Sequence, residues 1–205
     1  MPGYYDAESD HYDESRGGVE RARAAARAID ALISGGELSG GPVSGRGLCL
    51  DLAGGTGLVS AELAALGWAV FVIDLSPGML RLASSRLPHR AIRASADRIP
   101  VRPEAVDLIT VIWMFNLVPS ALVDAVLAEA ARVLVPGGHL VVTVDKELAH
   151  SRTSATDSDS DPRVSEVAAR LGLERVGSGE FTGRTKWRSV TEDDPAFRLA
   201  AFRRP

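Results

Sequence analysis

Short apolar runs of strand length alternate with helix-length segments between Leu48 and Val144, and this alternation constrains the fold of the 205-residue chain most. Strands are expected at the apolar runs, at 48–52, 69–73, 91–94, 106–112 and 140–144. Helices are expected between them, at 58–66, at 76–87 with Ser76 as its cap, and at 120–134. Strands joined through helices form right-handed crossovers, so the pattern predicts a parallel sheet with helices on both faces.

The segments on either side of this core differ from it in composition. Residues 1–18 are polar with several aromatic side chains and no helical period, a helix rich in Ala and Arg is expected at 19–33, and the Gly- and Ser-rich stretch 34–47 is expected to be a linker. We therefore expect one structural domain, with an N-terminal lid segment, helix and linker at 1–47 and a core at 48–205.

The chain after Val144 begins with a polar stretch of low complexity. Residues 150–163 are expected to form a mobile loop, and the acidic run DSDSD at 157–161 within it is expected to be solvated. A short helix at 162–171 and strands at 174–181 and 196–203 are expected to complete the fold. Lys186 and Trp187, between those strands, are expected in a turn.

Composition and charge argue against several classes of function. The formal net charge of −4 weakens the case for a nucleic-acid partner, and no apolar run approaches the ~18 residues of a membrane span. The acidic N-terminus resembles neither a secretory signal nor a transit peptide, so a cytoplasmic location is expected. A single cysteine, Cys49, can form neither an intrachain disulfide nor a thiolate cluster; it is expected in the core, and no metal site is expected.

The turn after the first core strand, with the sequence DLAGGTG from Asp51 to Gly57, is the most informative short motif. Glycines let the backbone turn tightly and approach a ligand, and the start of the next helix offers unpaired N–H donors. Dinucleotide enzymes use the same geometry, and residues 55–60 approximate their G-x-G-x-x-G pattern with Ser in the last place. The carboxylate of Asp51 would repel a pyrophosphate, whereas it would suit a cationic ligand.

LCLDLAGGTG resembles the first motif of class I S-adenosylmethionine-dependent methyltransferases, written D-x-G-x-G-x-G. The match covers Asp51, Gly55 and Gly57, with Ala53 where the family usually has its first glycine. Alanine costs little there unless its φ is positive. The resemblance implies a Rossmann-like, doubly wound α/β fold with a mostly parallel seven-stranded sheet whose last strand is antiparallel. The cofactor, S-adenosylmethionine, carries an ammonium and a sulfonium and no phosphate.

Three further segments resemble later motifs of this family in the same order. In FVIDLSPGMLRLA (71–83), Asp74 falls where the family's acid holds both ribose hydroxyls, because a carboxylate can accept two O–H bonds at once. RASADRIPV resembles the segment that frames the adenine, with Ser95 or Asp97 accepting from its amine, and RVLVPGGHLVV (132–142) resembles the signature before the fifth strand. The resemblance implies these cofactor-binding residues: Tyr12, Asp51, Ala53, Gly54, Gly55, Thr56, Gly57, Asp74, Leu75, Met79, Ser95, Ala96 and Asp97.

Two more regions are candidates for the reaction itself. DHYDESRGG resembles an N-terminal segment that folds over the cofactor as a lid in related enzymes, which makes His11 and Tyr12 weak catalytic candidates. Trp113, Phe115 and Asn116 follow a central strand and are candidates for the acceptor pocket, because the carboxyl ends of parallel strands form the ligand crevice. Trp113 and Phe115 could equally be packed in the core.

The resemblance implies methyl transfer to an O, N or C atom of a small-molecule acceptor by in-line displacement, with S-adenosylhomocysteine as product. Proximity and orientation would supply most of the catalysis. Two alternatives stay open: an NAD(P)-dependent oxidoreductase on a similar sheet, and a protein that binds S-adenosylmethionine without catalysis. Methylation of RNA or protein is disfavoured by the charge, no membrane partner is expected, and a homodimer is compatible with the sequence.

Overall fold

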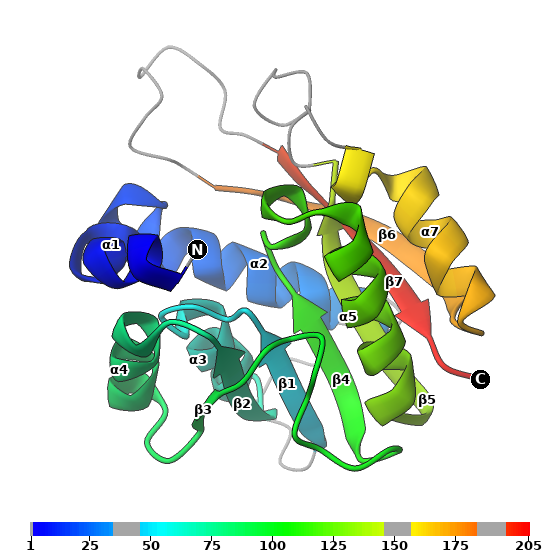
Figure 1. Cartoon of the computed structure of the whole chain (residues 1–205), viewed down its shortest axis with the longest axis horizontal. Helices are drawn as coiled ribbons and strands as arrows, with labels where there is room; N and C mark the ends of the chain where they lie inside the picture. Colours follow the sequence, from blue (N-terminus) through cyan, green and yellow to red (C-terminus); the bar gives the residue numbers. More distant parts are fainter. Residues whose placement is uncertain (1, 35–45, 146–156, 184–195) are drawn as a thin grey trace.

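A seven-stranded sheet in the order β3-β2-β1-β4-β5-β7-β6 forms the centre of the computed structural model, which describes residues 2–34, 46–145, 157–183 and 196–205 (Figure 1). The strands are β1 Leu48–Leu52, β2 Ala69–Asp74, β3 Ala91–Arg93, β4 Val106–Val111, β5 Leu134–Val144, β6 Glu174–Thr182 and β7 Ala196–Arg203. Strands β1 to β5 pair in parallel, and β7 runs antiparallel to β5 and β6. The predicted mostly parallel sheet with an antiparallel last strand is confirmed.

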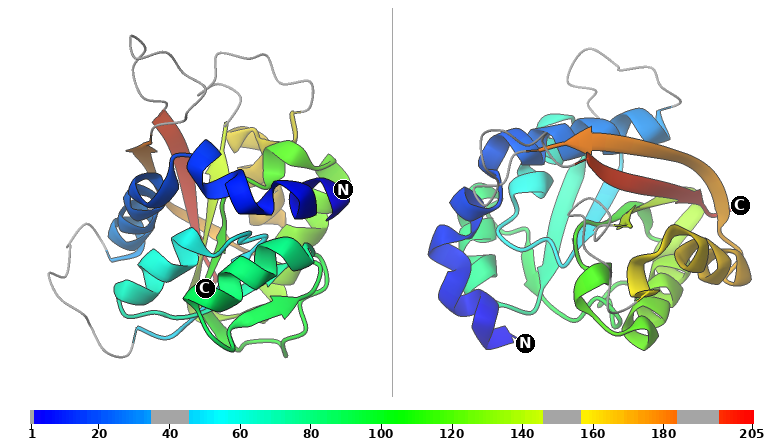
Figure 2. Two further views of the ribbon diagram at one scale, coloured as in Figure 1. Left: turned by 90° about the vertical axis from the view of Figure 1, so that its left-hand side faces the viewer. Right: turned by 90° about the horizontal axis from the view of Figure 1, so that it is seen from above.

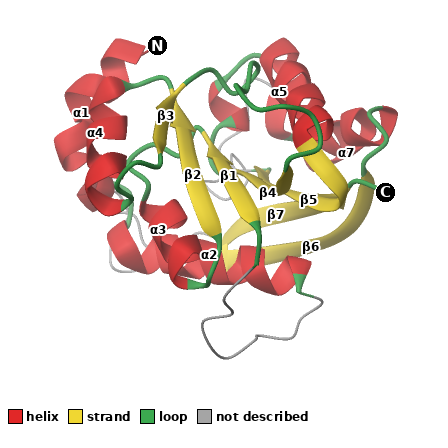
Figure 3. Ribbon diagram, turned by 90° about the horizontal axis from the view of Figure 1, so that it is seen from below, coloured by secondary structure: helices red, strands yellow, loops and turns green. Residues whose placement is uncertain are grey.

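Helices cover both faces of this sheet (Figure 2, Figure 3). On one face, side chains of α2 and α3 pack with Cys49 and Val70, and on the other, side chains of α5 and α7 pack with Leu50. Successive residues of a strand point to opposite faces, so β1 contributes to both cores. The helices are α1 Pro2–Ser15, α2 Gly18–Ile33, α3 Leu58–Ala65, α4 Pro77–Arg86, α5 Ser120–Val133 and α7 Asp161–Arg170, with short 3₁₀ turns η1 Phe115–Leu117 and η2 Asp157–Asp159.

The strand order reverses between β1 and β4. The chain leaves β1 towards β2 and β3 and then returns to β4 on the other side of β1. The loops after β1 and β4 therefore diverge, which opens a crevice at the carboxyl ends of these two strands. No helix in the described ranges is both long and apolar enough to cross a bilayer.

The first helix was not predicted. The segment 2–15 is polar and has no apolar stripe, yet it forms α1, which packs against α4. Its contacts are largely polar: Asp6 accepts hydrogen bonds from the Ser76 hydroxyl at 2.5 Å and from the Gly78 N–H at 2.9 Å. Hydrophobic periodicity cannot find a helix that is held in this way.

The acidic run 157–161 is not the solvated loop that its composition suggested. Ser158 and Asp159 are only 1% and 3% exposed. The Ser158 hydroxyl donates to the Phe115 carbonyl at 2.9 Å, and the Asp159 carbonyl accepts from the Asp145 N–H at 2.9 Å. Burial of these polar groups is tolerated because each finds a hydrogen-bond partner. Residues 150–156, like Lys186 and Trp187, lie outside the described residues.

The strand expected from Leu140 begins earlier than predicted, at Leu134. Pro136, Gly137 and Gly138 do not precede this strand but lie within it as an irregularity. The register with β4 changes from Val106 opposite Leu134 to Leu108 opposite His139.

Candidate functional site

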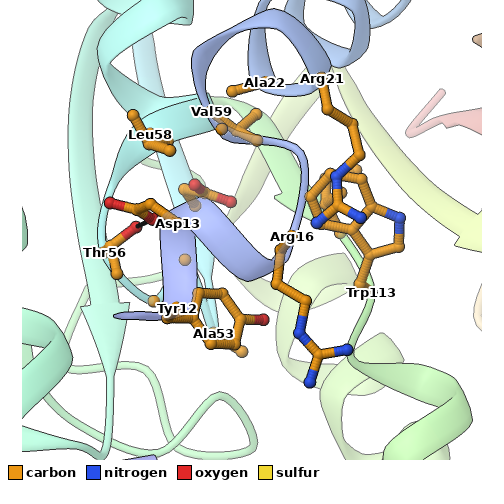
Figure 4. Close-up of a pocket in the computed structure, with 15 residues that line it drawn as sticks. Tyr12, Asp13, Arg16, Arg21, Ala22, Ala53, Thr56, Leu58, Val59 and Trp113 are labelled. Atoms are coloured by element: carbon orange, nitrogen blue, oxygen red, sulfur yellow. Dashed lines mark hydrogen bonds between the residues drawn. The ribbon is translucent and has the colours of Figure 1, made fainter. Parts of the chain in front are cut away.

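A small cavity of about 60 Å³ lies at the carboxyl ends of β1 and β4, in the crevice described above (Figure 4). The turn after β1 and the residues after β4 form its floor, and α1 and α2 cover it. Its walls are Tyr12, Asp13, Arg16, Gly18, Arg21, Ala22, Asp51, Ala53, Gly54, Gly55, Thr56, Leu58, Val59, Ile112 and Trp113. Ligand pockets usually measure roughly 300–1,000 Å³, so this cavity by itself is much too small for a nucleoside.

The turn after β1 needs left-handed backbone at three positions. Gly55 and Gly57 have φ of 58° and 74°, and Ala53 has φ of 54°. The conformation is easy for glycine, whereas it costs an L residue roughly 1–2 kcal/mol. The replacement of the family's first glycine by Ala53 is therefore not neutral, and the turn stores backbone strain beside the cavity.

This strain gives the first prediction. Ala53→Gly should raise the free energy of unfolding by roughly 0.5–1 kcal/mol, because relief of the left-handed strain exceeds the roughly 0.4–1 kcal/mol cost of a more flexible unfolded chain. Urea denaturation measures the change. The matched control is Ala61→Gly inside α3, which should destabilise by about 1 kcal/mol. A destabilisation of similar size by both variants would contradict the prediction.

Asp51 lies at the bottom of the cavity and is 1% exposed. One carboxylate oxygen accepts from the Thr110 hydroxyl at 2.8 Å and the other from the Ser60 hydroxyl. Burial raises the pKa of Asp51 to about 6, against the lowering effect of these two bonds. Its charge faces the cavity from below while its oxygens are held by the protein, so Asp51 contributes a negative potential near neutral pH.

The raised pKa of Asp51 predicts a pH-dependent stability. The folded state holds this proton more tightly than the unfolded chain, so ionisation opposes folding. The loss of unfolding free energy caused by this ionisation is absent below about pH 4 and complete above about pH 6. The advantage of Asp51→Asn over the natural chain in unfolding free energy should grow between pH 4 and pH 7, by an amount on the order of 3 kcal/mol. Denaturation of both proteins across this range measures the change, and a constant difference would contradict it.

Asp74 ends β2 beside the glycine turn. Its carboxylate accepts from the Gly55 N–H and from the Ser76 N–H, each at 2.9 Å. Burial raises the pKa of Asp74, and the backbone hydrogen bonds oppose that shift. Two N–H donors fix the orientation of this carboxylate and leave lone pairs free to accept hydroxyl groups of a ligand.

The adenine-side residues lie outside the cavity walls. The Ser95 hydroxyl donates to the Asp97 carboxylate, Ala96 is buried in the core, and Met79 is 2% exposed under the glycine turn. Leu75 is 48% exposed. Asp74 also lies outside the cavity walls, although its carboxylate is hydrogen-bonded to Gly55, which is one of them.

Three of the sequence candidates are not among the cavity walls. His11 is exposed on α1 and is not among the cavity walls. Phe115 is 1% exposed and packs in the core with α5, which is the second of the two positions considered for it. Asn116 also lies outside the walls, with its side-chain oxygen buried and without a partner among the described residues.

Trp113 lines the cavity and has an unusual backbone. Its φ is 61°, and its N–H donates to the Thr143 hydroxyl at 2.7 Å. The indole packs edge-on against Phe181 and Phe197, with ring centroids 5.8 and 5.6 Å apart. Positive φ is a costly conformation for a bulky residue, and such strain is found where a side chain is held for function.

Sequence reasoning missed the polar residues that α1 and α2 bring to the cavity. Asp13 of α1 accepts from the Thr56 hydroxyl at 2.5 Å and pairs with Arg86 at 2.5 Å, which ties α1 to the glycine turn. Arg16 and Arg21 line the other side (Figure 4). Arginine makes up 21 of the 23 basic residues, so no single one is conspicuous in the sequence.

Comparison with known proteins agrees with this architecture. Residues 50–142 match the family described as "Methyltransferase domain". A ubiquinone/menaquinone biosynthesis C-methyltransferase from Acidiphilium cryptum is 41% identical over 97 residues, which cover 43% of this chain and 38% of that protein. The chain thus matches about two fifths of the length of such curated relatives.

Solved structures resemble the whole fold at low identity. A SAM-dependent methyltransferase from Thermotoga maritima has a TM-score of 0.69 and 14% identity over 100% of both chains. Geranyl diphosphate methyltransferase in complex with GPP and sinefungin has a TM-score of 0.65 and 16% identity, covering 88% of this chain and 77% of that one. Residues 50–142 of this chain therefore match the methyltransferase-domain family, and the whole chain shares the fold of solved SAM-dependent methyltransferases.

Proposed function

We propose that this protein transfers a methyl group from S-adenosylmethionine to a small-molecule acceptor. The observation that carries the proposal is the junction of Asp74 with the glycine turn, where the Asp74 carboxylate accepts the Gly55 N–H at 2.9 Å. It places an acid suited to a ribose directly beside a backbone that a ligand can approach closely. The match of residues 50–142 to a methyltransferase domain supports the same function.

The chemistry of the residues fits this cofactor. Asp74 would hold the ribose hydroxyls, because its remaining lone pairs accept O–H bonds. The negative charge of Asp51 suits the ammonium and sulfonium groups, and Gly54 lets the backbone pass close to it, since a Cβ there would meet the Asp51 carboxylate at 2.7 Å. Two carboxylates beside the turn are a poor setting for the pyrophosphate of a dinucleotide, which disfavours the oxidoreductase.

When bound, S-adenosylmethionine supplies an already activated methyl group, so the chain has mainly to align the acceptor and exclude water. Trp113 offers an aromatic surface to an acceptor in the cavity, and Phe181 and Phe197, buried behind it, hold its indole ring. Burial raises the pKa of Tyr12, so at neutral pH its hydroxyl can donate a hydrogen bond but does not act as a ready base. We assign no general base.

We also propose that α1 is the lid over this site. Asp6, Asp10 and Asp13 lie on α1 and contact α4 or the glycine turn, and the cavity beneath α1 holds only about 60 Å³. On this proposal α1 moves aside to admit the cofactor and shields the reacting end of the site from water when it returns. Lids of this kind complete and seal active sites in many enzymes.

Calorimetry with S-adenosylhomocysteine and with NADH tests the cofactor assignment. We expect micromolar binding of the first and no binding of the second, and the reverse would favour the oxidoreductase. Transfer of a radioactive methyl group from S-adenosylmethionine to a panel of small acceptors then tests catalysis. The panel should include the demethylated quinones suggested by the Acidiphilium cryptum relative. Tight cofactor binding with no transfer to any compound would favour the non-catalytic alternative.

A further inference from the structure

Arg21 is the most unusual charged residue of the cavity. It lies on α2, is 7% exposed, and its guanidinium sits 4.0 Å from the centre of the Trp113 ring and 5.6 Å from that of Phe197. Gly183, after β6, packs against its aliphatic stem so closely that a Cβ there would lie 2.2 Å from the Arg21 Cγ. The side chain is therefore held in place and directed into the cavity (Figure 4).

No carboxylate neutralises Arg21 among the described residues. The two acidic side chains in the cavity walls are used elsewhere: Asp13 bonds to Thr56 and Arg86, and Asp51 bonds to Ser60 and Thr110. Burial lowers the pKa of Arg21 to about 10, which still leaves it charged at neutral pH. A buried cation without a counter-ion is costly, and natural proteins usually pair such charges.

A second cation faces the same space. Arg16 lies over the Tyr12 ring, 5.4 Å from its centre, and its Nε atom is buried without a hydrogen-bond partner among the described residues. Its ion pair, with Glu8, is a marginal one at 4.0 Å on the outer surface. The charge of Arg16 also lowers the pKa of Arg21, so the two guanidiniums repel one another. An anion between them would remove this repulsion and satisfy the open donors.

We propose that Arg21, with Arg16, forms a carboxylate-binding site at the end of the cavity opposite Thr56. A guanidinium presents two parallel N–H donors that match the two oxygens of a carboxylate. The stacking on Trp113 fixes the plane of these donors. This inference rests in part on the proposed function, because one source of the carboxylate is the amino-acid end of S-adenosylmethionine. The other source is an acidic acceptor.

Calorimetry with two thioether nucleosides tests the first source. S-adenosylhomocysteine has the carboxylate, and 5′-methylthioadenosine lacks the amino-acid part. Arg21→Gln should weaken binding of S-adenosylhomocysteine at least tenfold and leave 5′-methylthioadenosine within twofold, which also shows that the variant is folded. The matched control is Arg23→Gln, two residues along α2, whose side chain is 51% exposed and pairs with Glu62 on the surface. This control should change neither affinity.

Sodium benzoate, an aromatic carboxylate, tests the second source. If the acceptor supplies the carboxylate, benzoate should bind the natural chain saturated with S-adenosylhomocysteine, and Arg21→Gln should abolish that binding while the nucleoside affinities stay unchanged. Arg16→Gln should weaken whichever carboxylate binds. The proposal is overturned if Arg21→Gln alters the binding of neither carboxylate probe. If neither nucleoside binds the natural chain, the proposed function fails. Benzoate binding that is lost in Arg21→Gln would then still support the carboxylate site.

Discussion

Replacement of Asp74 by alanine is expected to weaken the binding of S-adenosylhomocysteine by about 2 kcal/mol or more, roughly thirtyfold in Kd. The variant loses the acceptor for the ribose hydroxyls. It also leaves the Gly55 and Ser76 N–H groups without their partner, which loosens the turn against which a nucleoside must lie. Because 5′-methylthioadenosine has the same ribose, its affinity should fall by a similar factor, unlike the effect expected of Arg21→Gln.

The matched control for Asp74→Ala is Asp107→Ala. The Asp107 carboxylate also accepts a backbone N–H, from Leu48 at 2.8 Å, but at the start of β1 rather than its end. Asp107→Ala should lower the free energy of unfolding, as Asp74→Ala does, and leave the Kd for S-adenosylhomocysteine unchanged. Calorimetry measures binding, and urea denaturation shows that both variants are folded at the assay temperature. An unchanged Kd in folded Asp74→Ala would rule out the role given to this carboxylate.

A chain that starts at Gly18 and so lacks α1 is expected to lose at least tenfold in turnover. The sheet, Asp74 and the glycine turn do not depend on α1 for their strand pairing, so S-adenosylhomocysteine should still bind, with faster association and dissociation. Its affinity should fall as far as it does in Arg16→Gln, because the shortened chain also lacks Arg16. Turnover should fall because water reaches the reacting groups. Stopped-flow binding and steady-state assays measure these two effects, and a shortened chain with full activity would refute the lid.

Single substitutions on α1 test whether its contacts with the glycine turn are needed for turnover, as distinct from the presence of the helix. Asp13→Ala removes a side chain that is 22% exposed and bonded to Thr56 and Arg86, so it should reduce turnover in the same direction as the deletion. Asp10→Ala is the matched control on the same helix. Its ion pair with Arg81 is on the surface, with side chains 70% and 60% exposed, and such pairs contribute little.

Much of the sheet could be predicted because its signals are local. The apolar run of β1, the cap of α4 and the period of α5 are each written in a few neighbouring residues, and the Ser76 hydroxyl accepts from the Met79 N–H as predicted. Hydrophobic periodicity and capping chemistry are the strongest signals in a single sequence. The order of motifs likewise placed Asp51 and Asp74 at the ends of adjacent strands.

The missed features depend on contacts between residues far apart in the chain. Asp6 and Ser76 are separated by 70 residues, and Ser158 and Phe115 by 43. The residues next to them in the sequence therefore give no sign of these hydrogen bonds. Arg21 differs from the other arginines only because Trp113 and Gly183 enclose it. The positive φ of Ala53 and Trp113 is likewise set by the fold, whereas a sequence pattern treats both as ordinary residues.

The hydrogen bond between Ser158 and the Phe115 carbonyl joins the stretch before α7 to the loop after β4. Different segments therefore hold the two ends of the crevice. The end at Asp74, proposed for the nucleoside, is formed by β1, β2 and α4, whereas the loop after β4, at the other end, is held by Ser158, 43 residues further along the chain than Phe115. Under the proposed function, we expect substitutions at Ser158 to change the preference for the acceptor and to leave the affinity for the nucleoside unchanged. A chain built in this way lets selection for a new acceptor act on one end of the crevice without disturbing the proposed binding of the methyl donor at the other.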